Sequence, residues 1–188
     1  MNSEFKTERL SARPIELSDA PRVAELFQEK ELPWNLGRAP WPYALSDAEN
    51  WLTLAQKQWA AGTEFPFAIL KDGTLIGSCG IMRIDEAQNI WEIGYWVGKP
   101  YWGKGYVTEA SIGLLDWAAR EAGITRFVSG YIFDNPASGR VLEKLGFEHV
   151  GEIEMHVTGR NSIVRSPRYI RNAPVEEALK DPLTGKRR

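Results

Sequence analysis

The chain has 188 residues, of which 43% are hydrophobic, 11% aromatic and 26% charged, and its formal net charge is −2. This length suits one domain, and the aromatic content excludes a disordered protein. The small negative charge argues against direct binding of nucleic acid or of an anionic membrane. One cysteine and two histidines argue against a metal site and exclude an internal disulfide. We therefore expect a single domain over residues 1–175, without a metal, and a polar, basic tail over residues 176–188.

The start of the chain, Met1–Arg9, lacks the apolar run of a secretory signal. No stretch of the sequence approaches the roughly 20 apolar residues that a membrane span requires. We therefore expect a cytoplasmic protein. The sequence leaves open whether it is a monomer or a homodimer.

Short elements of both kinds are predicted in the first third of the chain. The apolar positions of Glu8–Ile15 predict a short strand, and a helix opens at Ser18. Three prolines within residues 31–45 predict a long irregular loop. The next helix is expected to begin at a capping box formed by Ser46 and Glu49.

The rest of the chain predicts a sheet with helices on its faces. A turn at Lys71-Asp72-Gly73 joins two apolar runs into a hairpin, and Ile90–Val97 is a further strand. Apolar spacing then predicts a helix that ends at Gly123. The remaining expected elements are a strand at Arg126–Ile132, a helix opening at Asn135-Pro136, and strands around His149–Met155 and Ile163–Ile170. Such an order predicts an α/β fold whose strands pair first antiparallel and are then linked through helices.

A glycine-rich turn between a strand and a helix carries the clearest chemical signal. Gly103 and Gly105 allow backbone N–H groups to converge, and the start of the helix adds partial positive charge. Lys104 adds a full charge. The segment lacks the third glycine of a dinucleotide fingerprint and the Gly-Lys-Ser/Thr of a P-loop. It therefore fits a diphosphate bound without a metal, or else a tight turn that needs glycine only for its dihedral angles.

Several motifs together resemble the GCN5-related N-acetyltransferases (GNAT). They are Glu92-Ile-Gly-Tyr-Trp-Val97, Tyr101-Trp-Gly-Lys-Gly-Tyr-Val-Thr-Glu-Ala110, Asn135-x-x-Ser138 and Glu143-Lys-Leu-Gly-Phe147. Their order and spacing are most similar to the RimJ/RimL-like branch, which contains ribosomal-protein N-terminal acetyltransferases. The resemblance covers roughly residues 8–170.

The resemblance implies a fold and an activity. The implied fold is a single-domain α/β structure with a mixed, mostly antiparallel central sheet, splayed central strands and helices on both faces. The implied activity is acetyl-CoA-dependent N-acetylation of a primary amine, either a protein N-terminus or a small molecule, by direct attack in a ternary complex. A different class of protein also stays open as an alternative: a sensor that binds acyl-CoA at this turn but does not catalyse acetyl transfer.

The resemblance also assigns the acetyl-CoA site. The pyrophosphate would rest on the backbone amides of five consecutive residues, Gly103, Lys104, Gly105, Tyr106 and Val107. The pantetheine arm would run beside Ile90–Val97 and use its free backbone groups near Trp96 and Val97, as an added strand would. Asn135 would bond the pantetheine amide and Ser138 the sulfur. Pro100 departs from the family, which often has Gln or Arg at that position.

Catalysis needs a donor for the developing oxyanion and a proton for the leaving thiolate. A backbone N–H near Trp96 or Val97 is the expected oxyanion donor, and Cys79, in an apolar strand, is expected to be a buried hydrophobe rather than a nucleophile. Leu142 stands where many relatives carry a tyrosine acid, so Ser138 is the predicted substitute. The alternative is that Asn135 and Ser138 serve only as a helix cap.

Glu92 is the expected general base, because it is a carboxylate in an otherwise apolar strand. Burial there would make it a stronger proton acceptor. Glu152, Glu154, His156 or a chain of waters are the alternatives, and an ordinary exposed charge is the non-catalytic one.

Aromatic residues in the long loop are candidates for the acceptor side, namely Trp34, Trp41 and Tyr43. Glu29 and Glu31 would attract the acceptor's ammonium group. The alternative is that these rings only close the edge of the core. Further along, Arg160, Arg165, Arg168 and Arg171 are interpreted as a solvated strand face, with an acidic acceptor or an RNA-bearing partner as the alternative.

Overall fold

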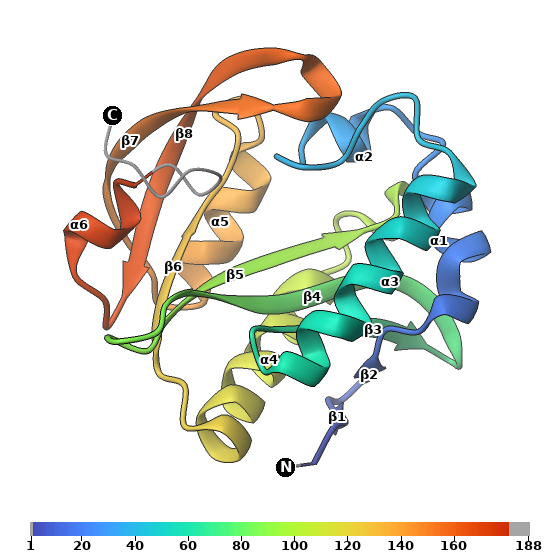
Figure 1. Cartoon of the computed structure of the whole chain (residues 1–188), viewed down its shortest axis with the longest axis horizontal. Helices are drawn as coiled ribbons and strands as arrows, with labels where there is room; N and C mark the ends of the chain where they lie inside the picture. Colours follow the sequence, from blue (N-terminus) through green and yellow to red (C-terminus); the bar gives the residue numbers. More distant parts are fainter. Residues whose placement is uncertain (1, 181–188) are drawn as a thin grey trace.

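The computed structural model describes residues 2–180, which form one eight-stranded sheet with helices on both faces (Figure 1). The strand order is β1-β2-β3-β4-β5-β6-β8-β7, and only the β5–β6 pair is parallel. The strands are β1 (Phe5–Lys6), β2 (Ser11–Pro14), β3 (Glu64–Lys71), β4 (Thr74–Asp85), β5 (Ile90–Val97), β6 (Arg126–Gly130), β7 (Glu148–Val157) and β8 (Ser162–Arg171). The predicted mostly antiparallel α/β fold is confirmed.

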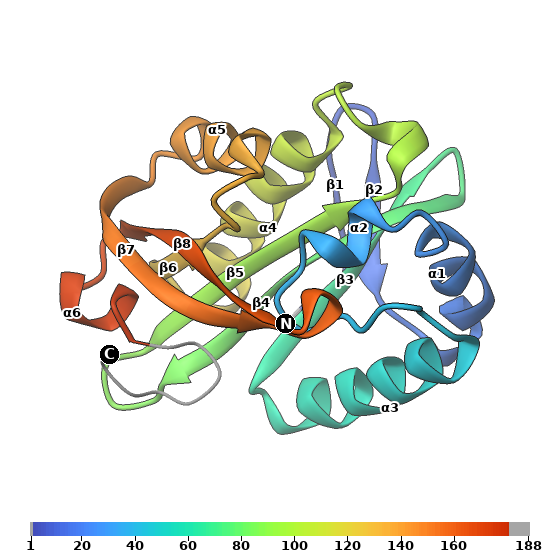
Figure 2. The same cartoon turned by 90° about the horizontal axis from the view of Figure 1, so that it is seen from above.

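Figure 2 shows α4 and α5 on one side of the sheet and α1 and α3 on the other. The α-helices are α1 (Ala20–Leu26), α2 (Glu31–Trp34), α3 (Leu45–Ala61), α4 (Tyr106–Ala122), α5 (Pro136–Lys144) and α6 (Val175–Ala178). In the described part of the chain, the 3-10 turns η1 (Leu17–Asp19) and η2 (Lys99–Tyr101) precede α1 and α4, and η3 (Thr158–Arg160) lies between β7 and β8. None of the helices within residues 2–180 is long and apolar enough to cross a membrane.

The alternation of side chains along β3 and β5 divides the core between the two faces of the sheet. Phe65, Phe67 and Trp91 belong to the cluster that includes the α4 residue Trp117, which is 1% exposed. Trp96 belongs to the second cluster, with residues of α1 and α3. We call the surface of the sheet on the α4 and α5 side the α4 face and the opposite one the α1 face.

The central strands separate where the resemblance predicts a splay. β5 and β6 pair only from Ile90–Arg126 to Glu92–Val128, so the rest of β5 has no partner in β6. Beyond that point β6 continues its pairing with β8. The Ser129 hydroxyl donates to the Ile93 carbonyl over 2.9 Å and marks where the strands part. One edge of β5 is therefore free in the middle of the sheet.

Two local predictions in the first third of the chain are wrong. The proline-rich segment contains the four-residue helix α2, because Pro33 lies in its first turn, where a proline needs no N–H partner. The helix α3 starts before the proposed box of Ser46 and Glu49. Its cap is the Asp47 carboxylate, which accepts a hydrogen bond from the Ala44 N–H at 2.8 Å.

Some residues of the predicted tail are part of the folded domain. Glu177 and Ala178, within α6, are buried, and the Arg168 Nε donates to the Ala178 carbonyl at 2.8 Å. Glu177 and Ala178 therefore belong to the packed structure. The rest of the predicted tail, residues 181–188, lies outside the described residues.

Candidate functional site

The glycine turn between β5 and α4 presents a row of unused backbone donors. Gly103 and Gly105 have φ values of +73° and +78°, which favour glycine, and Gly105 is the N-cap residue of α4. Among residues 2–180, no acceptor engages the N–H groups of residues 103–107. A Cβ on Gly103 would meet nothing within 4 Å, so no side chain fills the space in front of it. The turn therefore has the free donors and the open space that an anion requires.

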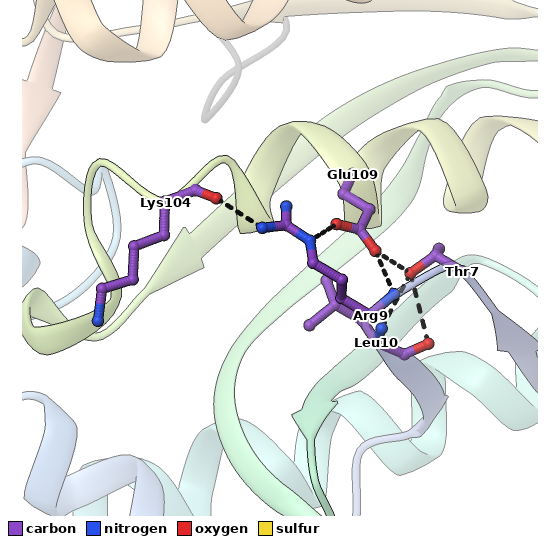
Figure 3. A network of polar contacts seen from close by, with 5 residues as sticks. All are labelled: Thr7, Arg9, Leu10, Lys104 and Glu109. Carbon is purple, nitrogen blue, oxygen red and sulfur yellow. Dashed lines mark hydrogen bonds and ion pairs between the residues drawn. The ribbon is translucent and has the colours of Figure 1, made fainter.

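Side chains of the N-terminal segment form a network of hydrogen bonds with this turn and with the first helical turn of α4 (Figure 3). The Arg9 Nη1 donates to the Lys104 carbonyl at 3.1 Å, and its Nε bonds the Glu109 carboxylate at 2.6 Å. The same carboxylate accepts the Thr7 hydroxyl at 2.6 Å. Burial acts against the charged form of Glu109, but the hydrogen bonds from Thr7 and Arg9 outweigh it and lower its pKa. Arg9 thus ties down a carbonyl of the turn while the N–H groups stay free.

The lysines near the turn are engaged elsewhere. The Lys104 ammonium donates to the Pro100 carbonyl at 3.0 Å. Lys99 forms ion pairs with Glu29 at 3.0 Å and with Glu31 at 2.8 Å. The Lys104 charge therefore bonds a carbonyl of its own turn, and the two glutamates expected to attract an ammonium group already hold one.

The register of β5 determines which of its backbone groups face the splay. Gly98 N–H donates to the Ile76 carbonyl at 2.9 Å, and Val97 lies opposite Gly77. Val97 and Gly77 are therefore a non-hydrogen-bonded pair, so the Val97 N–H points away from β4, toward the free edge. Trp96 lies opposite Ser78 and uses its N–H within the sheet. Of the two predicted oxyanion donors, only the Val97 amide faces the opening.

Asn135 and Ser138 lie at the start of α5 without acting as a helix cap. Asn135 is the N-cap residue, and its backbone N–H donates to the Ile132 carbonyl at 2.7 Å, but its side chain makes no capping bond. The Ser138 hydroxyl instead donates to the Tyr95 hydroxyl oxygen at 3.2 Å. The cap alternative is therefore wrong for both side chains. Leu142 is fully buried, in the cluster on the α4 face.

Glu92 forms a buried ion pair that the sequence analysis missed. Its carboxylate lies 2.9 Å from the guanidinium of Arg168, whose residue is only 3% exposed. Arg160 is also covered: its side chain is 9% exposed, and its guanidinium binds both oxygens of the exposed Asp134 at 2.7 Å. The interpretation of these arginines as a solvated strand face is therefore wrong for Arg160 and Arg168. Among the alternative bases, Glu152 bonds Arg165 at 2.9 Å.

A second carboxylate, Glu64, lies on the same face as Glu92. Glu64 is opposite Met82 of β4, and Met82 is opposite Glu92, so all three belong to one row across the sheet on its α1 face. Burial raises the pKa of Glu64, and Arg38 partly opposes this. In the sequence, the one sign of this second carboxylate is that Glu64 directly precedes the apolar run of β3.

The predicted acceptor-side aromatics divide between core and loop. Tyr43 is buried, with its ring 4.3 Å from that of Phe27, so it closes the edge of the core. Trp34 is half-buried, and the Arg160 guanidinium lies 5.2 Å from its ring. The Arg160 Nε also donates to the Trp34 carbonyl at 2.8 Å. Trp41, in the loop between α2 and α3, is half-buried.

The turn between β7 and β8 meets the segment around α2. Thr158 N–H donates to the Gly37 carbonyl at 3.0 Å, and a Cβ on Gly159 would lie 2.9 Å from the Ala39 carbonyl oxygen. Figure 1 shows the β7–β8 hairpin reaching across to this segment. The hairpin and the α2 segment thereby meet over the α1 face.

Covalent catalysis through the cysteine is not supported. Cys79 is 1% exposed, packed beneath α4, and burial strongly raises the pKa of its thiol. It is the buried hydrophobe that the sequence predicts. The described residues contain no group of three or more His, Cys, Asp or Glu side chains that could hold a metal.

Comparison with known proteins identifies the family. The family model described as an acetyltransferase (GNAT) domain matches residues 9–148. The chain belongs to the GNAT acetyltransferases. This assignment agrees with the splayed strands and the free amides at the start of α4, which were established independently of it.

The relatives of this GNAT chain include bacterial N-acetyltransferases. It is 27% identical to the uncharacterized N-acetyltransferase p20 of Bacillus licheniformis, over 84% of this chain and 89% of that one. It is 29% identical to the putative ribosomal N-acetyltransferase YdaF of Bacillus subtilis, over 77% and 81%. A structure of RimL, a ribosomal L7/L12 alpha-N-protein acetyltransferase in complex with coenzyme A, has the same fold. It superposes with a TM-score of 0.79 at 20% identity, covering 89% of this chain and 97% of that one.

Proposed function

We propose that this GNAT protein transfers the acetyl group of acetyl-CoA to the amine at the N-terminus of a protein or peptide. The run of unused polar groups carries the proposal: the amides of residues 103–107, the Val97 N–H on the free edge of β5, and the side-chain amide of Asn135. These groups would hold the pyrophosphate and the amide-bearing arm of coenzyme A. The relative named as a ribosomal N-acetyltransferase supports a protein acceptor, which would place the reaction in the cytoplasm.

Bound acetyl-CoA supplies an activated thioester, and the chain supplies its orientation. The Val97 N–H is the donor for negative charge that develops on the thioester oxygen. Ser138, on the first turn of α5, would turn its hydroxyl from the Tyr95 oxygen, where it donates at 3.2 Å, to the sulfur. Because Cys79 is buried, the amine attacks directly in a ternary complex.

The acceptor would approach over the α1 face, where two carboxylates can take up its proton. One oxygen of Glu92 is engaged by Arg168. Glu64 has no ion pair among the described residues, and its pKa is raised by burial. Glu64 therefore joins Glu92 as a proposed base. Trp34 and Trp41 are the proposed acceptor-side aromatics, whereas the ring of Tyr43 is buried in the core below the loop.

The release of the coenzyme A thiol tests this function. The purified protein is mixed with acetyl-CoA and with peptides whose N-terminus is either free or acetylated, and then with a polyamine, an amino acid and an aminoglycoside. We expect release with free peptide N-termini and none with the same peptides blocked. Release with a small amine alone would overturn the peptide acceptor. Acetyl-CoA binding without release by any amine would support a sensor and overturn the transferase.

A further inference from the structure

Tyr95 makes a pair of hydrogen bonds to Ser138 that no sequence motif predicts. The Tyr95 hydroxyl donates to the Ser138 backbone carbonyl at 3.0 Å. The Ser138 hydroxyl donates to the Tyr95 oxygen at 3.2 Å. The two residues are 43 positions apart and come from β5 and α5. One phenol therefore holds both the backbone and the side chain of Ser138.

Tyr95 lies at the place where the two substrates would meet. It follows Glu92, the last residue of β5 that pairs with β6, and precedes Val97 on the same free edge. Its side chain lies on the α4 face with Ile93 and Val97 and packs against the main core. The phenol thus spans the gap between the free edge of β5 and the first turn of α5.

The hydrogen-bond pattern limits what the phenol can do. A tyrosine hydroxyl has one proton, and here that proton is used on the Ser138 carbonyl. Burial raises the pKa of Tyr95, although the Ser138 hydroxyl partly opposes this, so the phenol stays protonated. The Ser138 hydroxyl also has one proton, which lies on the Tyr95 oxygen here, so it must rotate away from that oxygen to donate to a sulfur atom. The bond from Tyr95 to the Ser138 carbonyl stays in place during this rotation and keeps the serine backbone where it is.

We propose that Tyr95 is a positioning residue for Ser138: through the Ser138 carbonyl it holds the first turn of α5 against the free edge of β5, and its oxygen accepts the serine hydroxyl until a sulfur atom takes that proton's hydrogen bond. The proposal rests on the proposed function, in which Ser138 contacts the thioester sulfur. It accounts for a site in which Leu142 replaces the tyrosine acid of many relatives. Tyr95 does not itself donate a proton to the sulfur, because its own proton is committed to the helix backbone.

A double-mutant cycle of Tyr95→Phe and Ser138→Ala tests the proposal. We expect Tyr95→Phe to lower kcat by about tenfold and to leave the KM for acetyl-CoA unchanged. We expect the double variant to be no slower than Ser138→Ala alone, because the phenol acts only through the serine. Tyr131→Phe is the matched control. The Tyr131 ring also packs against α5, at 2.7 Å from a Cβ built on Gly139, and its hydroxyl does not bond Ser138.

Three results would overturn the proposal: wild-type kcat in Tyr95→Phe, losses that multiply in the double variant, or wild-type kcat in Ser138→Ala. If the wild-type protein releases no coenzyme A with any amine, the proposed function fails instead. Hydrogen exchange then tests the contact itself. Tyr95→Phe should speed exchange of the amides in residues 138–142, and Tyr131→Phe should not. Equal exchange in both variants would contradict the positioning role.

Discussion

Replacing Gly105 by valine is expected to weaken acetyl-CoA binding by about 100-fold or more, because the change acts on both the shape and the conformation of the amide turn. Gly105 has a φ of +78°, which a β-branched residue disfavours strongly. Its Cβ would lie 3.5 Å from the Arg9 guanidinium, the group that holds the Lys104 carbonyl. Isothermal titration calorimetry with acetyl-CoA measures the loss.

Gly123→Val is the matched control for this substitution. Gly123 ends the same helix, α4, with a φ of +65°, and a Cβ there would meet nothing within 4 Å. Both variants carry the same backbone strain, so both should unfold at a lower temperature than the wild type. Only Gly105→Val should lose affinity. Equal affinities in the two variants would remove the turn from the binding site.

Replacing Glu92 by methionine is expected to destabilise the protein by roughly 3 kcal/mol, because it leaves a buried guanidinium without its counter-charge. Arg168 is 3% exposed and cannot turn to solvent without breaking its bond to the Ala178 carbonyl. The double variant Glu92→Met/Arg168→Met should recover at least half of the loss, because it removes both charges. Urea unfolding followed by circular dichroism measures the free energies.

Glu152→Met is the control for Glu92→Met. It breaks the ion pair to Arg165, whose side chain is 58% exposed, so it should cost about 0.5 kcal/mol or less. A loss for Glu92→Met no greater than that of Glu152→Met would show that the Arg168 pair does not stabilise the fold.

The order of the elements could be predicted because each depends on neighbouring residues. The apolar run Ile90–Val97 and the two glycines after it set the end of β5 and the start of α4 in the structure. Gly123, at the end of α4, has the left-handed conformation that terminates a helix. A free amide turn at a strand–helix junction follows from such local rules, so the sequence could predict it.

The contacts that orient the site could not be predicted in the same way. Arg9 and Glu109 are separated by 100 residues, and Glu92 and Arg168 by 76. Such pairs depend on the sheet order and on which face a side chain occupies, and neither follows from local spacing. For this reason the sequence predicts a surface charge at Arg168, whereas the structure makes it the partner of Glu92.

Proline and capping rules failed for a related reason. The prolines of residues 31–45 predict an irregular loop, yet Pro33 lies in the first turn of a helix, where its missing N–H needs no partner. Asn135 was given a capping alternative from its residue type, but its dihedral angles, φ −114° and ψ 65°, occur without a capping bond from its side chain. Residue type indicates that an element starts near that position but does not fix what the side chain contacts.

The most direct test follows the backbone amides of the turn by NMR. Acetyl-CoA is titrated into ¹⁵N-labelled protein, and the resonances of residues 103–107 are compared with those of Gly62 and Gly123, which end helices away from the turn. If the turn holds the diphosphate, the amides of residues 103–107 shift strongly and the two reference glycines do not. Binding established by calorimetry with no shift in residues 103–107 would contradict the assignment of this turn as the acetyl-CoA site.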